Sequence, residues 1–434
     1  MIEQTGDGAA NIDAPIDGLP GVVRRIGRAS LLVVGDAILD RYVYGDVERI
    51  SPEAPVPLLT IRREIVVPGG AGNVVRNLGS LGASVAFVSV VGDDQAGSEL
   101  TGLIGGQPQV EPWLLVQGGL TTPLKTRFVA GGQQVLRTDR EDRVLPGDSP
   151  IHPKLAERLA RIAQDAMAAT SITVLSDYRK GVLTTTLGPA LIGAARATGR
   201  SVVVGMRGVG FARYAGAAVV VTAWRDLAMA TGVAGEDDAT VATAGAALRR
   251  AQDFGAVVAV RSGFGLSLID AGGAVHHAPL VPEIADLAGV GDGIVAVIGG
   301  ALAAGATIGQ AVELALHAGA VLARRAGTAV IRPSDLFHAL ATPHLQRVVG
   351  HAVAAERLEG WRRAGWRIGL WHLPLGAAAD DATLRRARDA SDRLAIVVRH
   401  ADDAATAADA GADLVLVEPN LDIAMHLLRP DWLG

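Results

Sequence analysis

Short, continuous apolar runs alternate with longer segments rich in alanine and leucine along most of this chain. Continuous runs are typical of strands that are buried on both faces of a parallel sheet. They predict strands at residues 30–36, 84–94, 172–178, 201–206, 217–223 and 256–262. Helical segments lie between the strands, for example at 152–169 and 239–255. This order predicts an α/β fold with helices on both faces of the sheet.

Two segments, 41–67 and 112–142, break this rhythm because polar and apolar residues alternate in them and glycines and prolines mark turns. Such alternation is typical of strands with one solvent-exposed face. We expect both segments to form antiparallel strands inserted into the α/β body as a small β lid.

Residues 293–312 carry no charge, and about 20 apolar residues are enough to cross a bilayer. Five glycines and a polar Thr-Ile-Gly-Gln break interrupt the segment, however. The pattern therefore predicts two buried helices with a turn near Gly305, and no membrane span.

The α/β pattern pauses near residue 341 and then resumes in a shorter form. We expect a solvated tail at 1–27, a main domain at 28–342 and a smaller Rossmann-like α/β domain at 346–434. The tail is acidic at its start and lacks the apolar core of a signal peptide, so the sequence favours a cytoplasmic protein.

Composition excludes several kinds of function. The 434 residues include no cysteine, so the chain has no disulfides, thiolate metal sites or cysteine nucleophile. The formal net charge of −5 argues against a general nucleic-acid-binding surface.

Candidate chemistry begins with Gly289, Val290, Gly291 and Asp292, which precede a long apolar helix. Free backbone N–H groups cluster at such a helix start and favour negative charge. The Asp292 carboxylate has two interpretations at this stage. It caps the helix, or it accepts a proton from a hydroxyl while the neighbouring amides stabilise a transferred phosphoryl group.

Two further polar sites stand near strand ends. Asp36 and Asp40 follow the first predicted strand, where open α/β sheets bind ligands, although an isolated aspartate there is often a turn residue. Gly69 and Gly70 allow close backbone approach, and the Asn73 amide both donates and accepts hydrogen bonds. The alternative for this second site is a tight turn into a helix with Asn73 exposed.

The order of these motifs resembles that of the ribokinase-like (PfkB) carbohydrate kinases. Within that family, the chain looks most like the heptose 7-phosphate kinases that carry a second, nucleotidyltransferase domain and serve lipopolysaccharide-core precursor synthesis. The segments that carry the resemblance are "GDAILDRYVYGDVERISPEAPVPLL", "PGGAGNVVRNLGSLGA", "KTRFVAGGQQVLRTDRED", "LSDYRKGVL" and "RSGFGLSLI". The resemblance implies a three-layer α/β/α sandwich with a small β lid, plus a Rossmann-like C-terminal domain.

The resemblance also implies roles for residues. Asp292 matches the catalytic base, and Gly289 and Gly291 match the loop that forms the anion hole. The substrate-binding positions are Asp40, Gly69, Gly70, Asn73, Lys125, Arg137 and Lys180, with the two lysines near the sugar phosphate. The nucleotide-binding positions are Arg207, Arg261, Ser262 and Gly265. The donor is expected to be ATP with Mg²⁺, which phosphate oxygens and water hold rather than a protein metal site.

By the same resemblance, the substrate is a phosphorylated sugar, most closely D-glycero-D-manno-heptose 7-phosphate accepting at its anomeric hydroxyl. The expected partner is a second copy of the chain, paired through the β lid. Neither a nucleic acid nor a membrane is expected as a partner.

The nucleotide side departs from the family pattern. Val290 stands where a small residue lies beside the phosphates, residues 205–208 read Gly-Met-Arg-Gly instead of Asp-Pro-Lys-Gly, and Trp224 and Leu227 replace an asparagine and a glutamate. In the C-terminal part, the stretch that matches the "HAGH" nucleotide motif keeps only His372, so nucleotidyltransfer is not expected.

The sequence leaves three interpretations open: an active sugar kinase, a non-catalytic relative that binds phosphosugar or a partner, and a kinase with another donor or acceptor. The first is favoured because the sugar-side motifs are intact.

Overall fold

A computed structural model describes three long ranges of the chain, residues 18–142, 149–280 and 285–340. It also describes shorter stretches at 346–349, 358–359, 361–362, 367–372, 391, 393–398, 412 and 414–417. Residues 1–17 of the expected tail lie outside the described residues.

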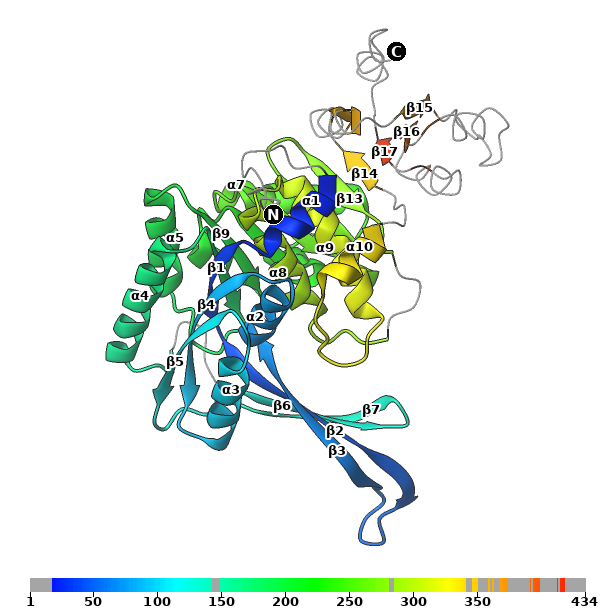
Figure 1. Cartoon of the computed structure of the whole chain (residues 1–434). Helices are drawn as coiled ribbons and strands as arrows, with labels where there is room; N and C mark the ends of the chain where they lie inside the picture. Colours follow the sequence, from blue (N-terminus) through cyan, green and yellow to red (C-terminus); the bar gives the residue numbers. More distant parts are fainter. Residues whose placement is uncertain are drawn as a thin grey trace, which may run out of the picture.

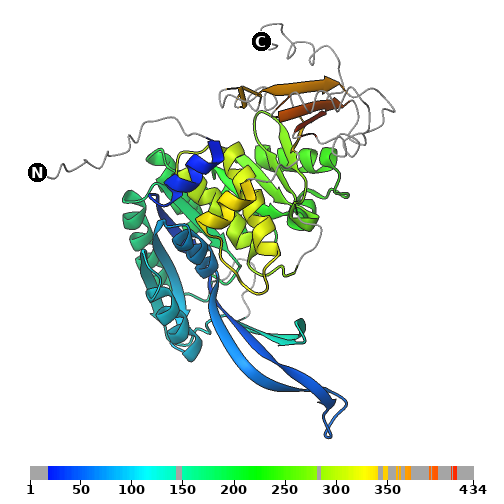
Figure 2. The same ribbon diagram turned by 45° about the vertical axis from the view of Figure 1, so that its right-hand side comes forward.

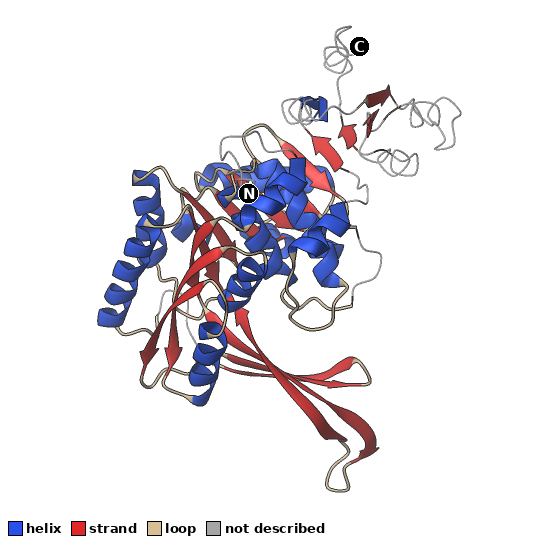
Figure 3. Ribbon diagram, in the orientation of Figure 1, coloured by secondary structure: helices blue, strands red, loops and turns tan. Residues whose placement is uncertain are grey.

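The body is built on one large sheet with helices on both faces (Figures 1 and 3). Its parallel part runs, in spatial order, through β5 (Val110–Gln117), β4 (Ser84–Gly92), β1 (Ser30–Gly35), β8 (Ile172–Asp177), β9 (Ser201–Met206), β10 (Val219–Ala223) and β11 (Ala256–Val260). The antiparallel strands β12 (Leu266–Ile269) and β13 (Ala274–His277) follow β11. All six predicted strands are confirmed, as is the ribokinase-like α/β class.

Two hydrophobic cores hold the helices against the sheet, one on each face. The first core contains side chains of α1 (Gly18–Ile26), α2 (Ala71–Ser80), α3 (Gln95–Gly105), α8 (Val290–Ala303), α9 (Ile308–Ala323) and α10 (Pro333–Leu340). The second contains side chains of α4 (Pro153–Ala168), α5 (Leu187–Ala197), α6 (Trp224–Thr231) and α7 (Asp238–Ala251). The predicted three layers are therefore present.

The long uncharged segment forms two helices, as predicted. α8 ends at Ala303 and α9 begins at Ile308, and Gly305 between them has a positive φ of 82°. Within the described ranges, no helix is long and apolar enough to cross a membrane.

The lid is a separate four-stranded sheet that projects from the body (Figures 1 and 2). It consists of β2 (Ala37–Ile50), β3 (Pro57–Gly70), β6 (Leu124–Ala130) and β7 (Gln133–Arg140). β2 pairs with β3 and β6 with β7 in antiparallel fashion, whereas β2 and β6 are parallel.

The prediction that the whole of 112–142 belongs to the lid is wrong for its first part. Residues 110–117 form β5, which pairs in parallel with β4 at the edge of the main sheet. An edge strand is covered less completely than a central one, so polar and apolar residues mix in it as they do in a lid strand.

The expected tail at 1–27 is wrong for residues 18–26, which form helix α1. Val22, Val23 and Ile26 lie on one face of this helix and are buried in the first core. The segment has only nine residues, two of them charged, so its helical periodicity does not stand out in the sequence.

The described C-terminal strands are β14 (Gln346–Val349), β15 (Ile368–His372), β16 (Arg393–Val398) and β17 (Leu414–Val417). They pair with one another in parallel, as a Rossmann-like pattern predicts. β14 also pairs with β13, so these strands extend the main sheet. A separate domain at 346–434 stays a prediction, and the side chain of His372 lies outside the described residues.

Helix α1 provides a test of this core. Ile26→Ala is expected to lower the free energy of unfolding by about 2–4 kcal/mol, because it leaves a cavity between α1 and α8. The exposed Arg24→Ala, in the same helix, is expected to change it by less than about 0.5 kcal/mol. Urea unfolding followed by circular dichroism measures both, and equal effects of the two variants would contradict the packing of α1.

Candidate active site

The Asp292 carboxylate lies in a buried cluster formed by three elements. It stands in the first turn of α8, and its oxygens face other elements rather than the amides of its own helix. The Asn73 Nδ2 atom of α2 donates to Asp292 Oδ2 at 3.0 Å, and the Tyr178 hydroxyl, just after β8, donates to Asp292 Oδ1. Of the two interpretations, the helix cap is therefore not the one observed.

Burial shifts the pKa of the Asp292 carboxyl. The residue is only 6% exposed, and burial raises the pKa of its carboxyl above the ordinary value. Arg207, Tyr178 and Asn73 oppose this rise, whereas the Asp40 charge adds to it. A carboxylate with a raised pKa accepts a proton more readily than one on the surface.

Asn73 connects the start of α2 to the start of α8. Its side chain is fully buried, which contradicts the exposed alternative, and its Nδ2 atom also reaches the Gly289 carbonyl at 3.3 Å. Gly289 has a φ of 76°, and a Cβ there would lie 2.5 Å from Asn73 Nδ2. A side chain at 289 would therefore push away the amide that holds Asp292.

A positive charge lies beside the start of α8. A Cβ on Gly291 would lie 2.7 Å from the guanidinium of Arg207, which follows β9 and stays exposed. The same guanidinium lies 5.5 Å from the ring centre of Tyr178. Because the N–H groups of residues 290–292 have no partner within the helix, this corner is suited to an anion.

The expectation that Val290 places its side chain beside the phosphates is wrong. Val290 is fully buried and belongs to the first core. Residues 290 and 292 are two positions apart in a helix and point in nearly opposite directions, so Asp292 faces the site while Val290 faces the core.

The sugar-side residues converge where the lid leaves the body. Asp40 of β2 accepts a hydrogen bond from Arg127 of β6 at 2.6 Å. A Cβ on Gly69 would lie 2.1 Å from Asp40 Oδ2, so glycine is needed for β3 to pass this carboxylate. Gly70, with a φ of 57°, then turns the chain into α2 and brings Asn73 to the same place.

Asp36 organises the loop that carries Tyr178. Its buried carboxylate accepts hydrogen bonds from the backbone N–H groups of Tyr178, Lys180 and Val182 at 2.7, 3.1 and 3.0 Å. Burial and the neighbouring Asp177 raise its pKa to about 6. Asp36 thus positions the site residues of this loop through their backbone.

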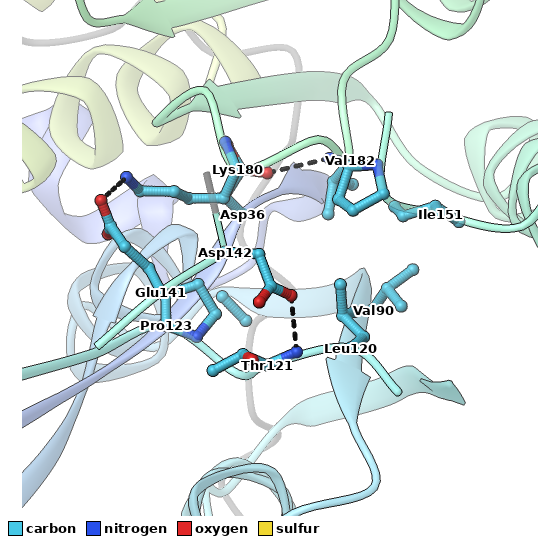
Figure 4. A pocket seen from close by; sticks show the side chains of 12 residues that line it. Asp36, Val90, Leu120, Thr121, Pro123, Glu141, Asp142, Ile151, Lys180 and Val182 are labelled. Atoms are coloured by element: carbon cyan, nitrogen blue, oxygen red, sulfur yellow. Dashed lines mark hydrogen bonds and ion pairs between the residues drawn. The ribbon is translucent and has the colours of Figure 1, made fainter. Parts of the chain in front are cut away.

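The two predicted phosphate lysines are brought together by Glu141, which follows β7. Lys180 Nζ lies 2.7 Å from one Glu141 oxygen, and Lys125 Nζ lies 3.8 Å from the other. Lys125 also pairs with Asp139 at 2.9 Å, and Asp139 pairs with Arg137. Lys180 and Glu141 line a cavity with Asp36, Thr121, Asp142 and Val182 (Figure 4). Asp292 does not line this cavity.

The predicted nucleotide residues fall into two groups. Arg207 lies with Asp292, whereas Arg261 pairs with Asp238 at the start of α7. Ser262 donates from its backbone N and its hydroxyl to Glu236, and Gly265 packs against the His277 carbonyl. Strand β10 lies between β9 and β11, which end at the two groups.

The described residues contain no cluster of three side chains that would hold a metal ion. Leu227 of α6 is buried in the second core, and the partly buried Trp224 packs against the same core. The carboxylate on α6 is instead Asp226, which accepts a hydrogen bond from the Gly208 N–H at 2.8 Å beside Arg207. Asp226 is thus an acidic side chain beside Arg207, of the type that can ligate magnesium.

The fold and this cluster agree with a family assignment. The model of the pfkB family carbohydrate kinases matches residues 28–335, so the chain belongs to this family. It is a carbohydrate kinase, an enzyme that transfers a phosphoryl group to a sugar, and members of the family use ATP as the donor.

Curated relatives cover most of the chain. It is 49% identical over 382 residues to the bifunctional protein HldE of Acidiphilium cryptum, a match covering 87% of this chain and 78% of that protein. The bifunctional protein HldE of Paramagnetospirillum magneticum is 42% identical over 381 residues, covering 86% and 77%.

Solved structures show the same fold. Phosphofructokinase-2 from Escherichia coli in complex with potassium gives a TM-score of 0.59 at 20% identity and covers 72% of this chain and 98% of its own. Arabidopsis thaliana ribokinase complexed with ribose and ATP gives 0.56 at 15% identity and covers 72% and 99%.

Tyr178, Arg127 and Glu141 are residues of the site that were not predicted from the sequence. Each lies inside or next to a motif that the resemblance used, but none was separated from its neighbours by residue type alone. Their roles follow from the partners that they contact across the fold.

Proposed function

We propose that the chain transfers the γ-phosphoryl group of ATP to a phosphorylated sugar, D-glycero-D-manno-heptose 7-phosphate, at its anomeric hydroxyl. The observation that carries this proposal is the Asp292 carboxylate, held by Asn73 and Tyr178 beside the guanidinium of Arg207. The sugar class is supported by the sugar-side motifs and by the similarity to the HldE proteins. The reaction would supply a precursor of ADP-heptose and of the lipopolysaccharide core, in the cytoplasm.

In this mechanism, Asp292 accepts the proton of the sugar hydroxyl. Each carboxylate oxygen holds one hydrogen bond from the protein and keeps a second lone pair for the substrate. The Tyr178 phenol stays protonated because burial and the Asp292 charge raise its pKa, so it remains a donor. The deprotonated sugar oxygen then attacks the γ-phosphorus.

On the nucleotide side, the bond between the γ-phosphorus and its bridging oxygen breaks, and its electron pair stays on ADP. The free N–H groups at the start of α8 and the Arg207 guanidinium face the oxygens of the transferred group. A magnesium ion, when bound, would neutralise phosphate charge, and Asp226, the carboxylate of α6, lies beside Arg207 and could help to hold it.

Asp292→Asn tests the base assignment. The amide keeps the size of the side chain but accepts no proton, so turnover is expected to fall by at least about 100-fold. Sugar binding is expected to persist. Steady-state kinetics and titration calorimetry with phosphosugar and with ATP–Mg²⁺ measure these effects.

Comparable turnover in the Asp292→Asn variant would contradict the base assignment. If the unaltered chain bound phosphosugar but no ATP, the kinase mechanism would be wrong and a binding role would take its place.

Tyr178→Phe tests the electrostatics of the base. Turnover is lost as the pH falls through the Asp292 pKa, because the protonated acid accepts no proton. The Tyr178 hydrogen bond lowers that pKa, so its removal is expected to move the acidic limb of the kcat profile to higher pH. An unchanged limb, or one moved to lower pH, would contradict this role.

We also propose that the chain forms a homodimer through the lid. Apolar side chains on the lid strands are more than a third exposed: Val47, Ile61, Ile65, Val135 and Leu136. Such exposure is typical of an interaction surface. Light scattering is expected to give about twice the mass of one chain, and Ile61→Asp is expected to reduce it toward one chain. A single-chain mass at every concentration would contradict this assembly.

A further inference from the structure

Glu141 lies where two of the chain's three lysines come together. Its carboxylate contacts Lys180 of the loop after β8 and Lys125 of lid strand β6. Both lysine side chains are less than a fifth exposed, whereas the Glu141 side chain is 29% exposed. The glutamate is thus the member of the group that reaches water most easily.

The two lysines are connected to both halves of the sugar site. Lys125 is the register partner of Asp40, and aligned residues of neighbouring strands carry their side chains on the same face. Lys180 stands two residues after Tyr178, and Tyr178 contacts Asp292. The backbone N–H groups of Tyr178 and Lys180 both donate hydrogen bonds to Asp36. A sugar lying between Asp40 and Asp292 would therefore have these ammonium groups near one end.

We propose that Glu141 is an internal anion that occupies the place of the sugar phosphate between Lys125 and Lys180. The phosphate displaces it on binding, so Glu141 sets the preference for a phosphorylated sugar. This inference rests on the proposed function for the identity of the sugar, but not for the competition between anions.

The difference in charge explains why a phosphate displaces the Glu141 carboxylate. The Glu141 carboxylate carries one negative charge and faces two ammonium groups, and Lys125 shares Asp139 as well. A phosphate monoester carries nearly two charges and three acceptor oxygens, so it satisfies two lysines better. An uncharged sugar or a single weak anion interacts too weakly with the lysines to replace their ion pairs with Glu141.

The surroundings allow this exchange by rotation of one side chain. Asp142 Oδ2 accepts a hydrogen bond from the Thr121 N–H at 2.8 Å, which fixes the backbone next to Glu141. Lys180 and Glu141 point toward each other along the wall of the cavity in Figure 4. The cavity beside the pair is small, so an incoming phosphate would take the room that the Glu141 carboxylate vacates.

Glu141→Gln tests the inference, because it removes the charge and keeps the size. Titration calorimetry with inorganic phosphate and with heptose 7-phosphate is expected to show about five-fold tighter binding of both. The double variant Glu141→Gln with Lys180→Met is expected to lose this gain. Asp46→Asn, which changes an exposed lid carboxylate paired with Arg62, is the matched control and is expected to bind as the unaltered chain does.

The outcomes separate the two proposals. If Glu141→Gln binds both ligands equally or more weakly while the unaltered chain phosphorylates heptose 7-phosphate, the role of Glu141 is wrong and the proposed function stands. If neither protein binds heptose 7-phosphate but inorganic phosphate still binds more tightly to Glu141→Gln, the sugar is wrong and the competition stands.

Discussion

The burial of the Asp292 carboxylate is the constraint on which the rest of the site depends. A charged group removed from water needs hydrogen-bond partners, and here they come from α2 and from the loop after β8. Those partners need support in turn: Asn73 by Arg76, and the backbone of Tyr178 by Asp36. The Asp292 carboxylate therefore connects the starts of α2 and α8 to this loop, within a frame that the first hydrophobic core holds.

Close approach accounts for the glycines around the site. Gly69, Gly289 and Gly291 each lie where a Cβ would meet a polar side chain, namely Asp40, Asn73 and Arg207. These glycines make room for the polar side chains of the candidate site. Gly289 has a positive φ, but Gly291 does not. At Gly291 the missing side chain is therefore needed for space and not for backbone conformation.

Two residues that depart from the family pattern at the expected nucleotide site lie in the hydrophobic cores. Val290 and Leu227 are buried in the two cores, where apolar side chains add stability. Neither side chain therefore obstructs the start of α8 beside Arg207. Arg207 and Asp226 supply charge there from neighbouring strand ends. Arg261 and Ser262 are tied to the residues before and at the start of α7, which separates them from the Asp292 cluster.

The sequence by itself determined the strand and helix pattern of the body, because periodicity is local and β1, β8 and α8 bury continuous apolar runs. Motif order also identified Asp292, Asn73 and Asp40 as members of one family pattern. Only the tertiary structure decided that nine residues fold as α1, that β5 joins the main sheet, and that Tyr178 and Glu141 belong to the site. These outcomes depend on contacts between residues far apart in the chain, 114 positions in the case of Tyr178 and Asp292, and no local pattern records such contacts.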